Sequence, residues 1–158
     1  MKIVADKAVD FKYTIVAGGN PEEYVFLKHD MKLDDKVEIL SSKPFEEVLR
    51  VMTEYDVLLL PSVVEGIANV AIEAMAVGLP VISSDASGMK ELVTDGETGF
   101  VFPARNAESL AASIIQFNDT TALQREAIAR RAKQSLKGKF DFETFSKGFD
   151  SFYKEIAG

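Results

Sequence analysis

The sequence predicts an α/β fold, a doubly wound, Rossmann-like parallel sheet covered by helices on both faces in three layers. Three observations predict it. Short apolar stretches recur at intervals of roughly twenty residues, segments with helical spacing separate them, and one stretch is apolar on both faces. Strands that alternate with helices are typical of a parallel sheet.

The apolar stretches are the predicted strands. Residues 57–60 read Val-Leu-Leu-Leu, and a continuous apolar run suits a strand buried between two layers of helices. The predicted strands are 11–17, 37–40, 57–60, 80–82 and 100–102.

Helical segments fill the intervals. Pro21 opens one and Pro44 precedes another, because proline fits the first turn of a helix. A third, 69–77, ends at Gly78 with Pro80 beyond it, which is a helix-stop signal. After the last strand the predicted helices are 107–117, 121–136 and 142–156. The aromatic stripe of the last helix is expected to pack in the core; it comprises Phe140, Phe142, Phe145, Phe149 and Phe152.

The first nine residues leave two alternatives open. They form the tail of a helix whose preceding strand is absent, or residues 2–5 form a short strand. The first strand of a doubly wound sheet lies centrally, so its absence would leave strand edges unpaired. We therefore expect residues 1–158 to be one domain of a longer, two-domain protein, and we expect the isolated domain to self-associate.

Composition excludes several classes of function. The chain has 158 residues, no cysteine and one histidine, so disulfides, thiolate catalysis and a histidine-rich metal site are excluded. A net charge of −7 argues against a nucleic-acid partner. Neither a signal peptide nor an apolar run of membrane-spanning length is present, so we expect a cytoplasmic protein, with peripheral membrane association left open for a longer one.

The segment 61–80 carries the chemistry. It follows a predicted strand and enters a helix, which is where open α/β sheets bind ligands. That helix is apolar nearly all round, so Glu73 within it needs a hydrogen-bond donor, and a structural pairing with a lysine or a backbone amide is the ordinary explanation. Glu65 in the loop, beside Gly66, favours a ligand instead, because glycine lets a ligand approach the backbone.

One ligand satisfies both features. The free amides of residues 66–70 at a helix start suit phosphate oxygens, whereas carboxylates accept hydrogen bonds from hydroxyls. A nucleotide sugar offers phosphate in the middle and a hydroxylated ring at each end. It is therefore the predicted partner.

The same residues carry a family resemblance. They read P-S-x-x-E-G-x-x-N-x-x-x-E-A-M-A-x-G-x-P-V-I, followed by Ser84-Asp85, Gly88 and a D-G-x-T-G-F stretch from Asp95. This resembles the E-x7-E signature of the retaining glycosyltransferases of the GT-B fold, glycosyltransferase family four (group 1). The resemblance covers nearly the whole chain and implies the C-terminal, donor-binding domain, one half of a GT-B fold.

The resemblance also implies roles for individual residues. Glu65 is the candidate catalytic-site residue, which holds hydroxyls of the transferred sugar, and Glu73 holds the ribose hydroxyls. Glu91 lies near the donor or merely begins a helix. The other implied donor-binding residues hold the diphosphate (Ile67, Ala68 and Asn69), border it (Gly18 and Gly19) or lodge the base (Leu40 and Ser41). Gly66, beside Glu65, is a further donor-binding candidate.

The implied activity is transfer of a sugar from a nucleotide diphosphate donor with retention, without a metal or a cofactor. The family's basic residues for the leaving group and its N-terminal acceptor domain have no counterpart here, so we expect the chain alone to be inactive but to bind nucleotide weakly. Ile67, Ala68 and Ser87 depart from the residues common in the family, which leaves sugar selectivity open.

Two other functions stay open. A sugar-nucleotide epimerase would use the same donor half, and a non-catalytic module would bind nucleotide sugars without transfer. A phosphoacceptor receiver domain needs acidic residues at strand ends, where this chain has Val16-Ala17-Gly18 and Leu60-Pro61-Ser62.

Overall fold

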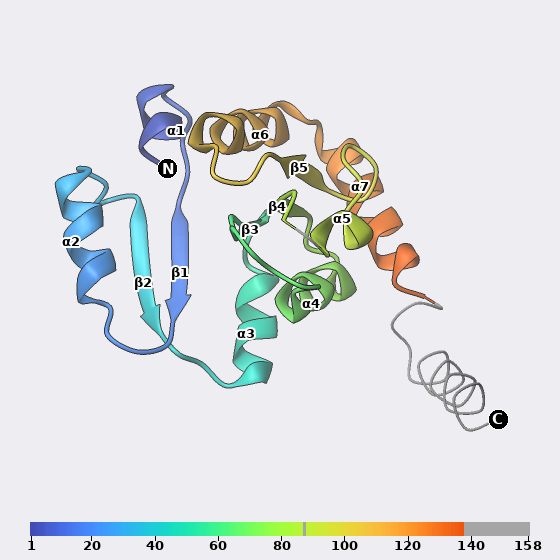
Figure 1. The fold of residues 1–158 in the computed structure, drawn as a ribbon, viewed down its shortest axis with the longest axis horizontal. Helices are drawn as coiled ribbons and strands as arrows, with labels where there is room; N and C mark the ends of the chain where they lie inside the picture. The colour runs from blue at the N-terminus through green and yellow to red at the C-terminus, as the bar shows by residue number, and fades with distance from the viewer. Residues whose placement is uncertain (87, 138–158) are drawn as a thin grey trace.

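A computed structural model describes residues 1–86 and 88–137 (Figure 1). Five strands and seven helices alternate along this part of the chain. The predicted helix 142–156, its phenylalanine stripe and Ser87 lie outside the described residues. No helix in the described part is long and apolar enough to cross a membrane.

All the strands pair in parallel, which confirms the predicted fold class. The strands are β1 (Tyr13–Ala17), β2 (Val37–Ser41), β3 (Leu58–Leu60), β4 (Val81–Ser84) and β5 (Phe100–Phe102). β1 pairs with β2, and β3, β4 and β5 pair in that order. The predicted strands overlap all five and differ from them by at most two residues at either end.

The helices were mostly predicted. They are α1 (Lys2–Asp6), α2 (Glu22–Asp30), α3 (Phe45–Met52), α4 (Asn69–Val77), α5 (Met89–Leu92), α6 (Ala107–Asp119) and α7 (Ala122–Ser135). Pro21 and Pro44 are the N-cap residues of α2 and α3, and α4 ends at Gly78 in the left-handed conformation. Of the two alternatives for the N-terminus, the helix is correct. The single turn of α5 was not predicted as a helix.

Two cores lie on opposite faces of the β3–β4–β5 sheet, which makes the three layers. Leu60 and Val81 pack with α3, α4 and α5 on one face. Leu59 and Ile82 pack with α1 and α6 on the other face. The side chains of β3 thus alternate between two apolar layers, which explains why its sequence is apolar on both faces.

A groove separates β1 from β3. Among the described residues no backbone pairing joins the two strands, so the sheet is in two blocks, with the unpaired strand edges that we expected where a central strand is absent. The groove has a volume of about 430 Å³, and both Ile15 of β1 and Leu58 of β3 line it. In the doubly wound order another strand lies at this position. Self-association through these edges stays a prediction.

The helix α2 buries none of its residues, unlike the others of similar length. Its apolar side chains are 40–70% exposed, and they are Tyr24, Val25, Phe26 and Leu27. The helix α2 lies beside the β1–β2 pair, on the side away from β3, β4 and β5 (Figure 1).

Candidate functional site

The candidate site centres on the loop 61–68, which joins β3 to α4. We call this segment the donor loop. Leu60, which is buried, ends β3 and Asn69 begins the helix, so the loop lies at the carboxyl end of β3, as the sequence predicted. Gly66 and Asn69 are exposed, whereas Ala68 is buried and fixes the end of the loop in the core.

The start of α4 presents free backbone amides. Ala68 is the N-cap residue, and it has no side chain that could accept a hydrogen bond from the first turn. Among the described residues, none accepts a hydrogen bond from the amides of residues 66–70. Such donors at a positive helix end form a site for an anion.

Glu65 lies in the donor loop and is partly buried. Its carboxylate accepts a hydrogen bond of 3.2 Å from the Ser62 hydroxyl. Within the described part of the chain, no lysine or arginine forms an ion pair with it. A carboxylate that is held by one hydroxyl keeps most of its acceptor capacity for a ligand.

Glu73 is also only partly buried, which corrects the prediction of a fully buried helix. The residues of α4 that are buried are Ala71, Ala74 and Met75, and Asn69, one turn before Glu73, is exposed. Because Glu73 is not fully buried, it does not need an internal partner, and no ion pair to it is present among residues 1–86 and 88–137.

The four remaining candidate residues lie together at the carboxyl ends of β1 and β2. Gly18 and Gly19 follow β1 directly, and Gly19 has a φ of +89°, which favours glycine. Leu40 and Ser41 are the last residues of β2, which extends one residue further than the predicted strand 37–40. Val16 pairs with Leu40 and Ala17 with Ser41, so both pairs share one edge.

None of the candidate residues lines the groove between the sheets, but residues next to two of the candidate regions do. Val16, two residues before Gly18, lines it, and so does Val70 in the first turn of α4. One hollow of the molecule therefore borders two of the predicted contact regions, the end of β1 and the start of α4. Thr14 and Tyr55 meet across the same groove through their hydroxyls.

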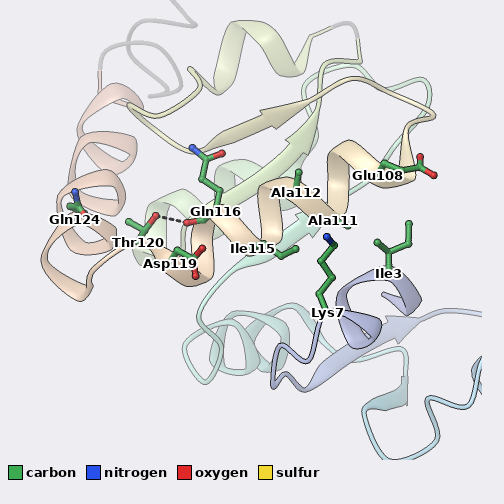
Figure 2. A pocket seen from close by; sticks show the side chains of 10 residues that line it. All are labelled: Ile3, Lys7, Glu108, Ala111, Ala112, Ile115, Gln116, Asp119, Thr120 and Gln124. Atoms are coloured by element: carbon green, nitrogen blue, oxygen red, sulfur yellow. Dashed lines mark hydrogen bonds between the residues drawn. The ribbon is translucent and has the colours of Figure 1, made fainter.

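A second hollow is unrelated to the predicted residues. It has a volume of about 780 Å³ and runs along α6 and α1 (Figure 2). Ile3 of α1 and Lys7, the C-cap residue of α1, face the helix α6 there. The Thr120 hydroxyl in the wall of this hollow donates to the Gln116 carbonyl at 2.7 Å. None of the candidate residues lines it.

Sequence reasoning missed the segment that follows β4. The Ser84 hydroxyl donates to the Ser62 carbonyl, and Gly88 lies against the backbone of Gly66 and Ile67. Ser84 and Gly88 are both part of the quoted motif, but the sequence pattern does not indicate that they contact the loop. Glu91, by contrast, lies in the first turn of α5 and is exposed.

Comparison with known proteins decides the family. The profile of the glycosyl transferases group 1 matches residues 1–135. The chain belongs to this family. The resemblance drawn from the motif in 61–80 is thereby confirmed.

Relatives of this glycosyltransferase domain are longer proteins. WcaL of Salmonella typhimurium, named for colanic acid biosynthesis, is 32% identical over 157 residues, which are 95% of this chain and 39% of WcaL. The amylovoran biosynthesis glycosyltransferase AmsK of Erwinia amylovora is 36% identical over 84% of this chain and 34% of its own length. The chain therefore spans less than half the length of these relatives.

Solved structures share the fold. Sucrose-phosphate synthase from Thermosynechococcus elongatus superposes with a TM-score of 0.85 at 24% identity, over 98% of this chain and 41% of the synthase. HepE of Anabaena, solved in complex with UDP, has a TM-score of 0.79 at 24% identity, over 92% of this chain and 41% of its own. These neighbours support the predicted half of a GT-B fold.

Proposed function

We propose that this domain binds the nucleotide diphosphate sugar donor of a retaining glycosyltransferase. The observation that carries the proposal is the start of α4, whose backbone amides have no side-chain cap. Two partly buried glutamates lie near these amides in the sequence, Glu65 before the helix and Glu73 within it. The structure of a relative of the same fold, HepE, was solved with UDP and with UDP-glucose, which supports this class of donor.

The diphosphate would lie at the amides of Gly66, Ile67, Ala68 and Asn69. The dipole of α4 and these donors favour negative charge at this point. Charge on the diphosphate increases as the bond to the sugar breaks, so donors that are already oriented would stabilise the transition state more than the ground state.

Glu65 and Glu73 would hold the two rings. Both carboxylates can accept hydrogen bonds from vicinal hydroxyls. Glu65, in the loop before the diphosphate site, would hold the transferred sugar. Glu73, on the same helix face as Asn69, would hold the ribose, and the base would lie along Leu40 and Ser41.

The proposed reaction is a substitution at the anomeric carbon of the sugar. The bond from this carbon to the phosphate oxygen breaks, and the diphosphate leaves with the electron pair. An acceptor hydroxyl forms the new bond on the face that the diphosphate leaves, and its proton passes to the departing diphosphate. The configuration is therefore retained. The rest of the longer protein would bind the acceptor. We therefore propose that this domain alone binds the donor but does not transfer the sugar.

Calorimetric titration of the 158-residue chain tests the proposal. UDP, GDP, ADP and UDP-glucose are titrated into wild type, Glu73→Ala, Glu65→Ala and Glu108→Ala. The last is the matched control, since Glu108 is an exposed glutamate in the first turn of α6. A hydrogen bond to a charged group contributes about 1.5–3 kcal/mol, so Glu73→Ala should weaken the preferred nucleotide about tenfold to a hundredfold.

This experiment should distinguish the role of Glu65 from that of Glu73. Glu65→Ala should leave UDP affinity near that of wild type and weaken UDP-glucose, because only the sugar contacts Glu65. Equal affinities for all four proteins would refute both roles. Turnover by the longer protein, followed by NMR of the product, distinguishes retained transfer from inversion and from release of a free epimerised sugar.

A further inference from the structure

Residues 84–86 and 88 form a segment at the end of β4 that contacts the donor loop near its start. Ser84 is the last residue of β4 and is fully buried. Its hydroxyl donates a hydrogen bond of 2.5 Å to the carbonyl oxygen of Ser62. The Ser62 hydroxyl in turn donates to Glu65, so Ser84 supports the residue that orients this carboxylate.

The same segment contacts the donor loop at its end. A β-carbon on Gly88 would lie 2.8 Å from the carbonyl carbon of Gly66 and 3.0 Å from the Ile67 nitrogen. Both distances are too short for a carbon against rigid backbone. Gly88 has a φ of −67°, which any residue adopts. Glycine is therefore needed at this position because there is no room for a side chain, not because of the backbone conformation.

The segment is itself fixed to the rest of the sheet. The Asp85 carboxylate accepts a hydrogen bond of 2.8 Å from the Ala104 amide, and the Asp85 amide donates to the Phe102 carbonyl at 2.8 Å. Lys90 forms an ion pair with the same carboxylate at 3.3 Å. The contacts to the donor loop therefore come from a support that β5 and α5 hold in place.

We propose that Ser84 and Gly88 are positioning residues that set the path of the donor loop at two points. Ser84 fixes the carbonyl of Ser62, and Gly88 allows the Gly66–Ile67 peptide to lie close against the segment. Together they aim the amides at the start of α4. The effect on ligand binding rests on the proposed function, whereas the effect on the loop does not.

Two variants test the two points. Gly88→Ala adds one methyl group that must displace the Gly66–Ile67 backbone, and Ser84→Ala removes one hydrogen bond without adding an atom. Gly99→Ala is the matched control. Its β-carbon would lie 2.6 Å from the Val81 carbonyl oxygen, an equally close collision with backbone that is not in the donor loop.

Three measurements are made on the 158-residue chain. Amide signals of Gly66 and Ile67 are followed by ¹⁵N NMR, thermal unfolding gives the stability, and titration gives the dissociation constant of UDP well below the unfolding temperature. We expect Gly88→Ala and Ser84→Ala to shift the two amide signals and to weaken UDP about tenfold, because binding geometry tolerates errors of only about 0.5 Å. Gly99→Ala should lower the unfolding temperature but keep both signals and the UDP affinity within twofold of wild type.

The outcomes separate the two proposals. Unshifted amide signals in both variants would overturn the positioning role, whether or not UDP binds. Shifted signals in a chain that binds no nucleotide would uphold the positioning of the loop and count against the proposed function. If Gly88→Ala does not fold, Ser84→Ala decides alone by the same readouts. A loss of UDP affinity in Gly99→Ala as large as that in Gly88→Ala would overturn the proposal, since a general loss of stability would then explain both.

Discussion

The carboxylate of Asp85 accepts a hydrogen bond from the backbone amide of Ala104, 19 residues later in the chain. This bond and, secondly, Lys90 hold the pKa of Asp85 below its usual range. The hydrogen bond between Asp85 and Ala104 links the end of β4 to the turn after β5. The ionisation of Asp85 therefore affects the segment that supports the donor loop.

Replacing Asp85 should change how stability depends on pH. A carboxyl group whose pKa is lowered in the folded state stabilises the fold above its unfolded pKa, and this contribution disappears as pH falls through the folded pKa. Asp85→Asn should therefore be less stable than wild type at pH 7, and the difference should shrink as pH falls below the ordinary range of a carboxyl group and through the lowered pKa of Asp85. Urea unfolding of both proteins between pH 7 and pH 2.5 measures it. A constant difference over that range would contradict the linkage.

Gly99→Ala should destabilise the fold. An added β-carbon would lie 2.7 Å from a methyl carbon of Val93 as well as close to the Val81 carbonyl, and Val93 and Gly99 both lie in the buried core. Overpacking of this kind costs about 1–3 kcal/mol. Urea unfolding at pH 7 gives the free energy. Gly66→Ala is the comparison, since a β-carbon there meets no atom within 4 Å and should cost far less stability.

Thr121→Ala should remove the capping box of α7. The Thr121 hydroxyl accepts from the Gln124 amide, and the Gln124 side chain accepts from the Thr121 amide. Loss of such a cap costs about 1 kcal/mol. Thr53→Ala, which removes an exposed hydroxyl at the end of α3, should stay within about 0.5 kcal/mol of wild type in the same unfolding assay. Equal losses in the two variants would argue against a special role for the cap.

Phe26→Lys should reduce self-association of the isolated domain. Phe26 is 70% exposed and lies among other exposed apolar side chains of α2. Contiguous apolar surface favours contacts between molecules. Light scattering over a concentration series should show a smaller average mass for this variant than for wild type. Leu123→Lys changes an equally exposed leucine outside α2, so the same decrease in both variants would show that charge alone is responsible.

Much of the fold could be predicted from local sequence. The strand 57–60 was recognisable because both of its faces are apolar, and α4 was recognisable because Gly78 ends it in a conformation that glycine favours. The donor loop could be located because these two signals lie on either side of it. Local periodicity and helix stop signals carry this kind of information.

Other features depend on contacts between distant segments. The partial exposure of Glu73 could not be predicted, since the composition of α4 indicates burial on every side whereas the fold covers only one. The support of Ser62 by Ser84 joins residues 22 positions apart. The lining of the groove between β1 and β3 depends on which side chains meet across it, which periodicity does not determine.

That groove has a consequence for the cooperativity of the fold. Among the described residues, β1 and β2 share no ladder with the other three strands, so the two blocks depend on side-chain packing and on the Thr14–Tyr55 hydroxyl contact. Amide protons of β1 and β2 should exchange with deuterium through a partial opening that leaves β3, β4 and β5 protected. A nucleotide that contacts both Ser41 and α4 would hold the two blocks together. Protection of the β1 and β2 amides from exchange should then increase with nucleotide concentration.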